Sequence, residues 1–341
     1  MIVVQKFGGT SVKGTERLRE VAKWVVENKN KGKKMIVVVS APGGMTDSLI
    51  EKAKEINSNP RGRELDMLLS VGEQISAALL AMGIEELGEK AISFNGSQLD
   101  IRTNNDYNNA KILSIPSKKI LDKLNDGYVV IVTGFQGIDS EGNTTTLGRG
   151  GSDTSAVAIG AAVGADKVEI YTDVDGVYTS DPRIVKKARK IKSISYDEMI
   201  EMADKGAKVL HCRSIELASK YEIPVELRSA FTWEEGTWIK KEKTMENSVV
   251  RGISNISNLA NLRINLKNME ELVEHLEENH IEVKLFQQLE NSKFSILTGK
   301  EEAQRFYKVL KNRGYFPELT DDLSMISVVG LGIASNNIPR K

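Results

Sequence analysis

The first two-thirds of the chain alternate between continuous apolar runs and stretches in which apolar residues recur with helical spacing. A short continuous apolar run is typical of a strand buried on both faces of a sheet. Such runs occupy residues 2–4, 35–39, 128–133 and 167–171. Helical spacing appears at Leu18, Val21, Ala22, Val25 and Val26, with Thr15 as the expected cap, and again through residues 68–82 and 154–163. This β–α order predicts a mainly parallel sheet with helices on both faces.

From about Asn247 the pattern changes to two short β–α units. Strands are predicted at residues 259–265, 281–286, 293–297 and 325–329, with helical stripes that begin near residues 269 and 303. The order β-α-β-β-α-β is typical of a small ferredoxin-like α+β domain. The charged stretch around residues 242–248 lacks periodicity and is the expected linker. We therefore predict two domains, residues 1–246 and 247–341.

Composition narrows the class of protein. The chain carries equal numbers of basic and acidic side chains, so we expect neither a nucleic-acid partner nor a membrane partner. Cys212 is the only cysteine, which excludes an intrachain disulfide and fits a reducing compartment. The N-terminus lacks the pattern of a signal peptide, and no apolar run approaches the ~20 residues of a membrane span. A soluble, cytoplasmic protein is expected.

The first predicted strand runs directly into Lys6-Phe7-Gly8-Gly9-Thr10-Ser11. Glycines let a backbone lie against phosphate oxygens, and a lysine supplies mobile positive charge for phosphoryl transfer. The order of residues fits neither a Walker A loop nor a dinucleotide fingerprint. An ordinary glycine turn after an edge strand remains the alternative. A second glycine-bearing loop, residues 40–46, follows the next strand, and ligands in such sheets bind beyond the carboxyl ends of strands.

Two further loops carry candidate chemistry. In residues 147–153 three glycines frame Arg149, Ser152 and Asp153 ahead of an Ala-rich helix, an arrangement suited to anions, and Arg149 can bind a carboxylate with two hydrogen bonds. The alternative is an arginine paired with a surface acid. Residues 171–183 hold three aspartates, but the spacing does not fit an EF-hand. This loop is predicted to line a nucleotide pocket, with a set of Asx turns as the alternative.

For the other reactive side chains, the local sequence pattern does not distinguish a functional role from a structural one. Glu73 lies in a helix with an apolar flank, Lys208 comes two residues after Gly206, and His211 has no partner with metal-ligand spacing. Cys212 is interpreted as a small buried hydrophobe. The sequence offers no obvious general base. A carboxylate nucleophile is already ionised at neutral pH and needs none, so lysines, glycine loops and an arginine fit phosphorylation of a carboxylate.

Taken together these motifs resemble the aspartate kinases of the amino-acid kinase family. The match covers roughly the first 250 residues, in the segments 6–12, 40–47, 72–73, 147–156, 172–183 and 206–211. The resemblance implies a three-layer αβα sandwich followed by an ACT-like domain that regulates or dimerises the protein. It also implies ATP-dependent phosphorylation of the β-carboxylate of L-aspartate to 4-phospho-L-aspartate, the first step towards lysine, threonine and methionine.

The resemblance also implies residue roles. Lys6 and Lys208 would neutralise charge on the transferring phosphoryl group, and Asp153 would orient them. The nucleotide is assigned to Lys6, Phe7, Gly8, Gly9, Ser11, Ser40, Thr172, Asp173, Tyr178, Arg183 and Lys208. Aspartate is assigned to Thr46, Glu73, Arg149, Gly150 and Ser152, with Arg149 on its α-carboxylate and Glu73 on its ammonium. Mg²⁺ would be carried mainly by ATP phosphates and water, so no metal-binding residue is expected.

The chain departs from the family pattern at two places. Cys212 stands where members usually have proline. Members usually end in a pair of ACT domains, whereas here about one is expected, without the usual Pro-Gly turn before its first helix. An active kinase with weak or altered feedback, assembled as a homo-oligomer (a dimer or higher), is the leading hypothesis. A catalytically silent amino-acid-sensing subunit that pairs with a longer kinase, and a kinase for another small amino acid, are the alternatives.

Overall fold

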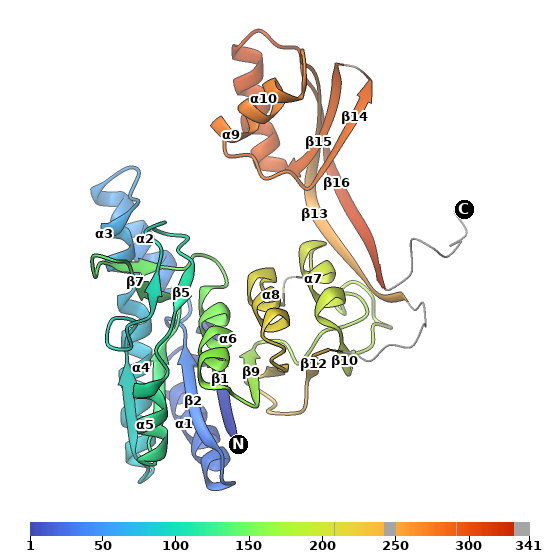
Figure 1. The fold of residues 1–341 in the computed structure, drawn as a ribbon. Helices are drawn as coiled ribbons and strands as arrows, with labels where there is room; N and C mark the ends of the chain where they lie inside the picture. The colour runs from blue at the N-terminus through green and yellow to red at the C-terminus, as the bar shows by residue number, and fades with distance from the viewer. Residues whose placement is uncertain (208, 242–249, 291, 331–341) are drawn as a thin grey trace. The chain divides into compact units, whose positions relative to one another are not determined.

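The computed structural model describes residues 1–207, 209–241, 250–290 and 292–330. Within these ranges the chain forms two compact units, Met1–Gly252 and Ile253–Val329 (Figure 1). The expected linker at residues 242–248 and the expected boundary after residue 246 lie outside the described residues.

The first unit is built on an eight-stranded sheet. Its strands, in spatial order, are β10 (Ser193–Ile194), β12 (Thr237–Ile239), β11 (Val225–Ser229), β9 (Lys167–Thr172), β1 (Ile2–Phe7), β2 (Lys34–Val39), β6 (Val129–Thr133) and β3 (Ala91–Phe94). Each neighbouring pair is parallel except β11 with β12. The mainly parallel sheet predicted from the apolar runs is confirmed.

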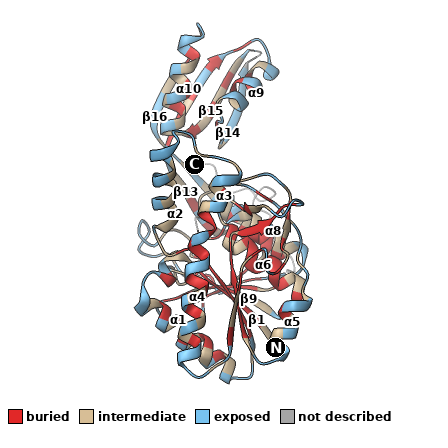
Figure 2. Ribbon diagram, turned by 90° about the vertical axis from the view of Figure 1, so that its left-hand side faces the viewer, coloured by how far each residue is buried: buried red, intermediate tan, exposed pale blue. Residues whose placement is uncertain are grey.

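Helices cover both faces of this sheet because successive side chains of a strand point to opposite sides. Val3 and Phe7 of β1 join the core made with α1 (Thr15–Asn30) and α4 (Val71–Glu86). On the opposite face, Val4 approaches Gly160 of α6 (Gly151–Val163), which packs beside α8 (Cys212–Lys220). Figure 2 shows buried strands running between these helical layers. The predicted three-layer sandwich is confirmed.

The remaining elements of this unit lie around the sheet. They are η1 (Gly9–Val12), α2 (Met45–Ile56), α3 (Arg63–Leu69), α5 (Lys118–Asn125) and α7 (Tyr196–Asp204). A second, smaller sheet has the order β5 (Ile112–Ser114), β4 (Arg102–Thr103), β7 (Gln136–Ile138) and β8 (Thr144–Thr146). The apolar pattern did not predict this sheet, because its strands are two or three residues long.

Three helix predictions need correction. The cap of α1 is Gly14, at φ 88°, and Thr15 is already helical. The predicted helix through residues 68–82 is two helices that meet at Ser70. The segment Arg63–Glu86 is long and apolar enough to cross a membrane by length and composition alone, but Leu80 and Ile84 belong to the protein core. Finally, α6 begins at Gly151 rather than at residue 154, because the preceding Gly150 adopts a left-handed conformation at φ 68° that turns the chain into the helix.

The second unit has the predicted β-α-β-β-α-β order. Its elements are β13 (Val250–Asn265), α9 (Met269–Glu278), β14 (Leu285–Glu290), β15 (Lys293–Gly299), α10 (Lys300–Asn312) and β16 (Glu318–Gly330). They form a sheet in the order β14-β15-β13-β16, and α9 and α10 share one core with it through residues such as Leu272, Phe294 and Phe306. The Asn268 side chain caps α9 by accepting a hydrogen bond from the Glu271 amide. The strand predicted at residues 281–286 begins later, at Leu285.

Candidate active site

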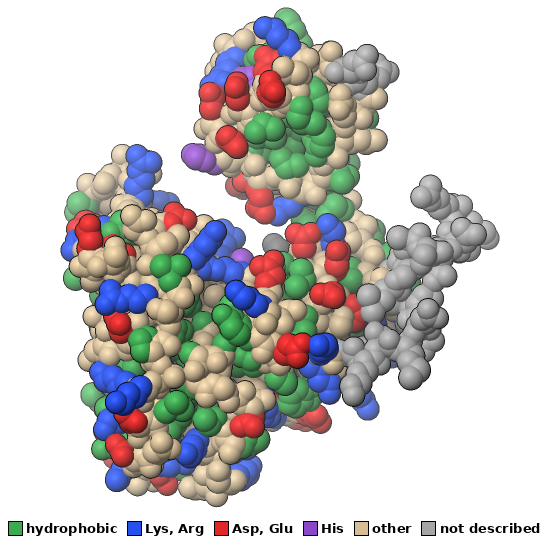
Figure 3. All heavy atoms as spheres, viewed as in Figure 1, with side chains coloured by type: hydrophobic (Ala, Val, Ile, Leu, Met, Phe, Trp, Pro, Cys, Tyr) green, Lys and Arg blue, Asp and Glu red, His purple; other side chains and the backbone are tan. Residues whose placement is uncertain are grey.

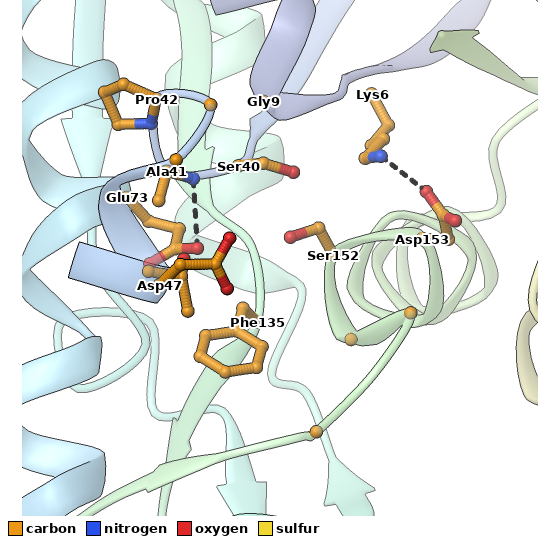
Figure 4. Close-up of a pocket in the computed structure, with 16 residues that line it drawn as sticks. Lys6, Gly9, Ser40, Ala41, Pro42, Asp47, Glu73, Phe135, Ser152 and Asp153 are labelled. Atoms are coloured by element: carbon orange, nitrogen blue, oxygen red, sulfur yellow. Dashed lines mark hydrogen bonds and ion pairs between the residues drawn. The ribbon is translucent and has the colours of Figure 1, made fainter. Parts of the chain in front are cut away.

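A pocket of about 340 Å³ lies beyond the carboxyl ends of β1, β2 and β6, where ligands of parallel sheets bind (Figure 4). Its lining residues come from the loops that follow these strands and from the starts of α2, α4 and α6. They are Lys6, Gly9, Ser40, Ala41, Pro42, Gly43, Gly44, Thr46, Asp47, Glu73, Phe135, Gly148, Gly150, Gly151, Ser152 and Asp153. The structure thus brings together parts of five segments, around residues 6–9, 40–47, 73, 135 and 148–153.

Lys6 and Asp153 form an ion pair at one wall of the pocket. Lys6 Nζ lies 2.7 Å from Asp153 Oδ1, and the two side chains are only 11% and 14% exposed. Asp153 is in the first turn of α6, where the helix dipole favours a negative charge. The pair therefore holds a mobile lysine side chain in one position, with its ammonium group at the pocket (Figure 4).

Close backbone contacts explain the glycines in the first two loops. A Cβ at Gly9 would lie 2.9 Å from the Ala41 carbonyl oxygen, and the Gly43 amide donates a 2.9 Å hydrogen bond to the Gly9 carbonyl. The Gly8 amide donates a 3.1 Å hydrogen bond to the Tyr171 carbonyl, which ties this loop to the end of β9. The two loops consequently form one continuous backbone wall of the pocket.

Glu73 presents half of a buried carboxylate without a hydrogen-bond partner. Its Oε1 accepts a 3.0 Å hydrogen bond from the Ala41 amide, whereas Oε2 is buried and has no partner among the described residues. Burial raises the pKa of Glu73 to about 7, against the lowering effect of the Ala41 hydrogen bond. The neighbouring Gly72 makes this approach possible, because a Cβ there would lie 2.6 Å from the Ala41 Cβ. The pocket thus contains a carboxylate suited to a cationic group.

The loop between β8 and α6 forms the opposite wall. Gly148 and Gly150 have φ angles of 73° and 68°, and a Cβ at Gly150 would lie 2.3 Å from the His211 Cβ. Ser152 packs against Gly134, where a Cβ would come within 2.8 Å of its own Cβ. Arg149 is exposed between two lining glycines and does not itself line the pocket.

The pocket lining does not include the other described residues that the resemblance assigned. The Phe7 ring is fully buried and stacks on Tyr171 at 4.7 Å, so only its backbone faces the loop, and Ser11 is also fully buried. Three further assigned residues bond to nearby carboxylates of the segment 172–183. The Thr172 hydroxyl donates a hydrogen bond to Asp173 and the Tyr178 hydroxyl donates one to Asp175, while the Arg183 guanidinium pairs with Asp181. Lys208 lies outside the described residues.

Asp47 and Phe135 are two of the lining residues that the sequence did not lead us to assign. Asp47 is in the first turn of α2, directly after the second glycine loop, and this position was the available signal. Phe135 follows β6 in the left-handed region at φ 70°, and no feature of its local sequence marks it. A phenylalanine in this conformation is uncommon and is held here by hydrogen bonds from its amide to Ser155 Oγ and from the Leu147 amide to its carbonyl.

Known proteins share both the sequence and the fold. The profile of the amino acid kinase family matches residues 1–229. An aspartokinase of Bacillus sp. (strain MGA3) is 45% identical in an alignment 350 positions long, which covers 98% of this chain and 85% of that protein. Aspartokinase 2 of Bacillus subtilis (strain 168) is 43% identical, with coverage of 98% and 86%.

Among solved structures, E. coli aspartokinase III in complex with aspartate and ADP in the R-state superimposes with a TM-score of 0.79 at 27% identity. The similarity covers 98% of this chain and 89% of that one. The order of the glycine loops, the sandwich fold and these relatives agree. The chain belongs to the aspartokinases of the amino acid kinase family.

Proposed function

We propose that this protein transfers the γ-phosphoryl group of ATP to the β-carboxylate of L-aspartate, giving 4-phospho-L-aspartate and ADP. The observation that carries the proposal is the pocket itself. It holds the buried carboxylate of Glu73 on one side and the Lys6 ammonium on another, beneath backbone loops that suit phosphate. A related protein, E. coli aspartokinase III, has been solved with aspartate and ADP. The reaction is the first step of lysine, threonine and methionine synthesis, and we place it in the cytoplasm.

In the proposed mechanism Glu73 Oε2 accepts a hydrogen bond from the substrate ammonium group. Arg149, which is exposed between two lining glycines, turns its side chain to bind the α-carboxylate. The β-carboxylate is already ionised, so one of its oxygens attacks the γ-phosphorus without a general base. The bond from phosphorus to the β,γ-bridging oxygen breaks, and ADP leaves with the electron pair. Lys6, fixed by Asp153, stabilises the negative charge that shifts between oxygens.

The nucleotide is proposed to extend from this pocket along the end of β9. The hydrogen bond from the Gly8 amide to the Tyr171 carbonyl places the first glycine loop next to Thr172 and Asp173, which supports this position. Mg²⁺ would arrive with ATP as part of the substrate. The described residues contain no group of three His, Cys, Asp or Glu side chains that could hold a metal ion.

A homo-oligomer is proposed on the basis of an exposed apolar stripe. Met67, Val71, Ile75, Leu79 and Met82 follow one another at spacings of three or four residues along α3 and α4, and each is more than a third exposed. Contiguous apolar surface of this kind marks protein interfaces. In the view of Figure 3, Lys and Arg side chains are interspersed with Asp and Glu on the first unit, so we propose no nucleic-acid partner.

A coupled assay of ADP release with aspartate, ATP and Mg²⁺ tests the proposed function. Lys6→Ala is expected to lower turnover by ~100-fold or more, while Lys34→Ala, at the exposed start of β2, leaves it unchanged. No turnover by the wild-type protein, despite binding of aspartate, would favour a silent sensing subunit. Faster turnover with glutamate than with aspartate would show that the protein is a kinase for a different amino acid. Adding lysine or threonine tests whether the second unit regulates the reaction.

A further inference from the structure

Asp66 of α3 is a fully buried carboxylate that lies outside the pocket lining. It accepts hydrogen bonds from two residues distant in sequence. The Thr146 amide and hydroxyl donate to it at 2.7 and 2.6 Å, and the Asn108 amide donates at 3.0 Å to Oδ2, with the Asn108 side-chain amide also donating. These donors are neutral, and no ion pair to Asp66 occurs within the described part of the chain. Such a concentration of bonds on one buried charge fixes the geometry of all three segments.

The segment held by Asp66 leads directly into the glycine loop of the pocket. Besides the Asp66 bonds, the Thr146 carbonyl accepts from the Ala110 amide at 2.9 Å. The Leu147 amide donates to the Phe135 carbonyl at 2.8 Å, and the Leu147 carbonyl accepts from Arg213 Nη1 at 2.8 Å. Every backbone polar group of Thr146 and Leu147 is therefore bonded. The loop begins at the next residue, Gly148, so its starting point is rigid.

The same carboxylate is connected to the opposite wall of the pocket. Asp66 is in α3, which meets α4 at Ser70, three residues before Glu73. The junction is also held from the other side, because Gln136 Nε2 donates a 2.9 Å hydrogen bond to the Ser70 carbonyl. Asn108, in turn, packs on the loop, since a Cβ at Gly148 would lie 2.9 Å from the Asn108 carbonyl oxygen. One buried group thus links the helix that carries Glu73 to the loop that carries Arg149.

We propose that Asp66 is a positioning residue that sets the separation between Glu73 and the Gly148–Ser152 loop, and thereby the affinity for the amino-acid substrate and the discrimination by its length. This inference rests on the proposed function, because it takes Glu73 and the loop as the two ends of the substrate site. Asp66 itself touches no substrate. Its effect should appear in the KM for aspartate and leave the KM for ATP unchanged, because the proposed nucleotide site lies at the end of β9.

Kinetics of three threonine variants and Asp66→Asn test the proposal. Thr146→Val removes one hydroxyl bond to Asp66, and Thr146→Ser retains it. Thr145→Val is the matched control: Thr145 is equally buried on the same strand, but its hydroxyl pairs with Thr103. We expect the KM for aspartate to rise ~10-fold in Asp66→Asn and a few-fold in Thr146→Val, with recovery in Thr146→Ser and the KM for ATP within twofold of wild type. The preference for aspartate over glutamate should fall in parallel.

Equal changes in Thr145→Val and Thr146→Val, or a lower melting temperature with an unchanged KM, would overturn the positioning role and leave a structural one. If Asp66→Asn does not fold, the three threonine variants still test whether the bonds to Asp66 control the KM for aspartate. Hydrogen exchange separates this inference from the proposed function. Even if the wild-type protein does not phosphorylate aspartate, the amides of residues 147–154 should exchange faster in Thr146→Val than in Thr145→Val. Equal exchange in the two variants would by itself contradict the proposal that Asp66 fixes the position of this loop.

Discussion

Replacing Glu73 by glutamine should stabilise the protein while it weakens aspartate binding. Burial raises the pKa of Glu73 from its ordinary value of 4.5 to about 7. Between these values the unfolded chain loses the proton first, so the wild-type free energy of unfolding falls as pH rises, and the full penalty applies above pH 7. A pKa shift of this size lowers the free energy of unfolding of the wild-type protein by ~3 kcal/mol at pH 8.5 and by ~1 kcal/mol at pH 5.5. Glutamine keeps the acceptor for the Ala41 amide but carries no charge.

Denaturant unfolding of wild type and Glu73→Gln at pH 5.5 and 8.5 measures this effect. The variant should be more stable at both pH values, with a gain larger by ~2 kcal/mol at pH 8.5. Glu169→Gln is the matched control of opposite sign. Burial acts to raise the pKa of the Glu169 carboxyl, but the Lys167 ammonium, 2.6 Å away, and hydrogen bonds from Gln5 and Tyr171 together lower it, so the loss of this charge should destabilise the fold. A Glu73→Gln variant that is less stable than wild type at pH 8.5, or whose gain does not change with pH, would refute the reasoning. Calorimetric titration should show weakened aspartate binding in the same variant.

The remaining predictions concern the pocket walls and the exposed stripe. Since the ammonium of the substrate needs an ionised Glu73, the apparent KM for aspartate should fall as pH rises from 6 to 8, and this dependence should disappear in Glu73→Gln. Gly72→Ala should raise the KM for aspartate and destabilise the protein by about 1–3 kcal/mol, because its Cβ would meet Ala41. Gly83→Ala is the control for the loss of a glycine from α4, because its Cβ would lie 3.4 Å from the Ala22 Cβ, and equal kinetics in the two variants would be contrary to expectation. Gly150→Ala should abolish measurable aspartate binding through its clash with His211, as calorimetry would show. Ile75→Glu places a charge in the exposed apolar stripe and should lower the molar mass measured by light scattering. An unchanged molar mass would show that the stripe is not the oligomer interface.

The strands of the main sheet were predictable because burial on both faces leaves a continuous apolar run, as in β2 and β6. The small sheet was not, because β8 consists of three threonines, and the hydroxyls of Thr145 and Thr146 bond to Thr103 and Asp66, which lie far away in the sequence. The start of α6 was misplaced because the left-handed conformation of Gly150 is set by its tertiary contact with His211. The local sequence pattern therefore predicts which segments bury an apolar face, but it does not reveal the tertiary contacts that decide the remaining features.

The candidate site shows the same division. The glycine loops and the Lys6 and Asp153 segments were visible as motifs. The resemblance implied that Asp153 orients Lys6, and the structure has the two side chains in an ion pair of 2.7 Å. Glu73 was ambiguous because a helix pattern does not reveal that the Ala41 amide lies 3.0 Å from one oxygen and that the other is buried. Asp66 carried no signal at all, since its partner Thr146 lies 80 residues away.

Formation of the acyl phosphate is the most direct test of the central claim. Purified wild-type protein is incubated with aspartate, ATP, Mg²⁺ and hydroxylamine, which converts an acyl phosphate to a hydroxamate that is measured by colour and mass. The account predicts aspartyl β-hydroxamate in step with ADP release, and neither product above background for Lys6→Ala. ADP release without hydroxamate, or equal hydroxamate from the wild-type and Lys6→Ala proteins, would contradict it.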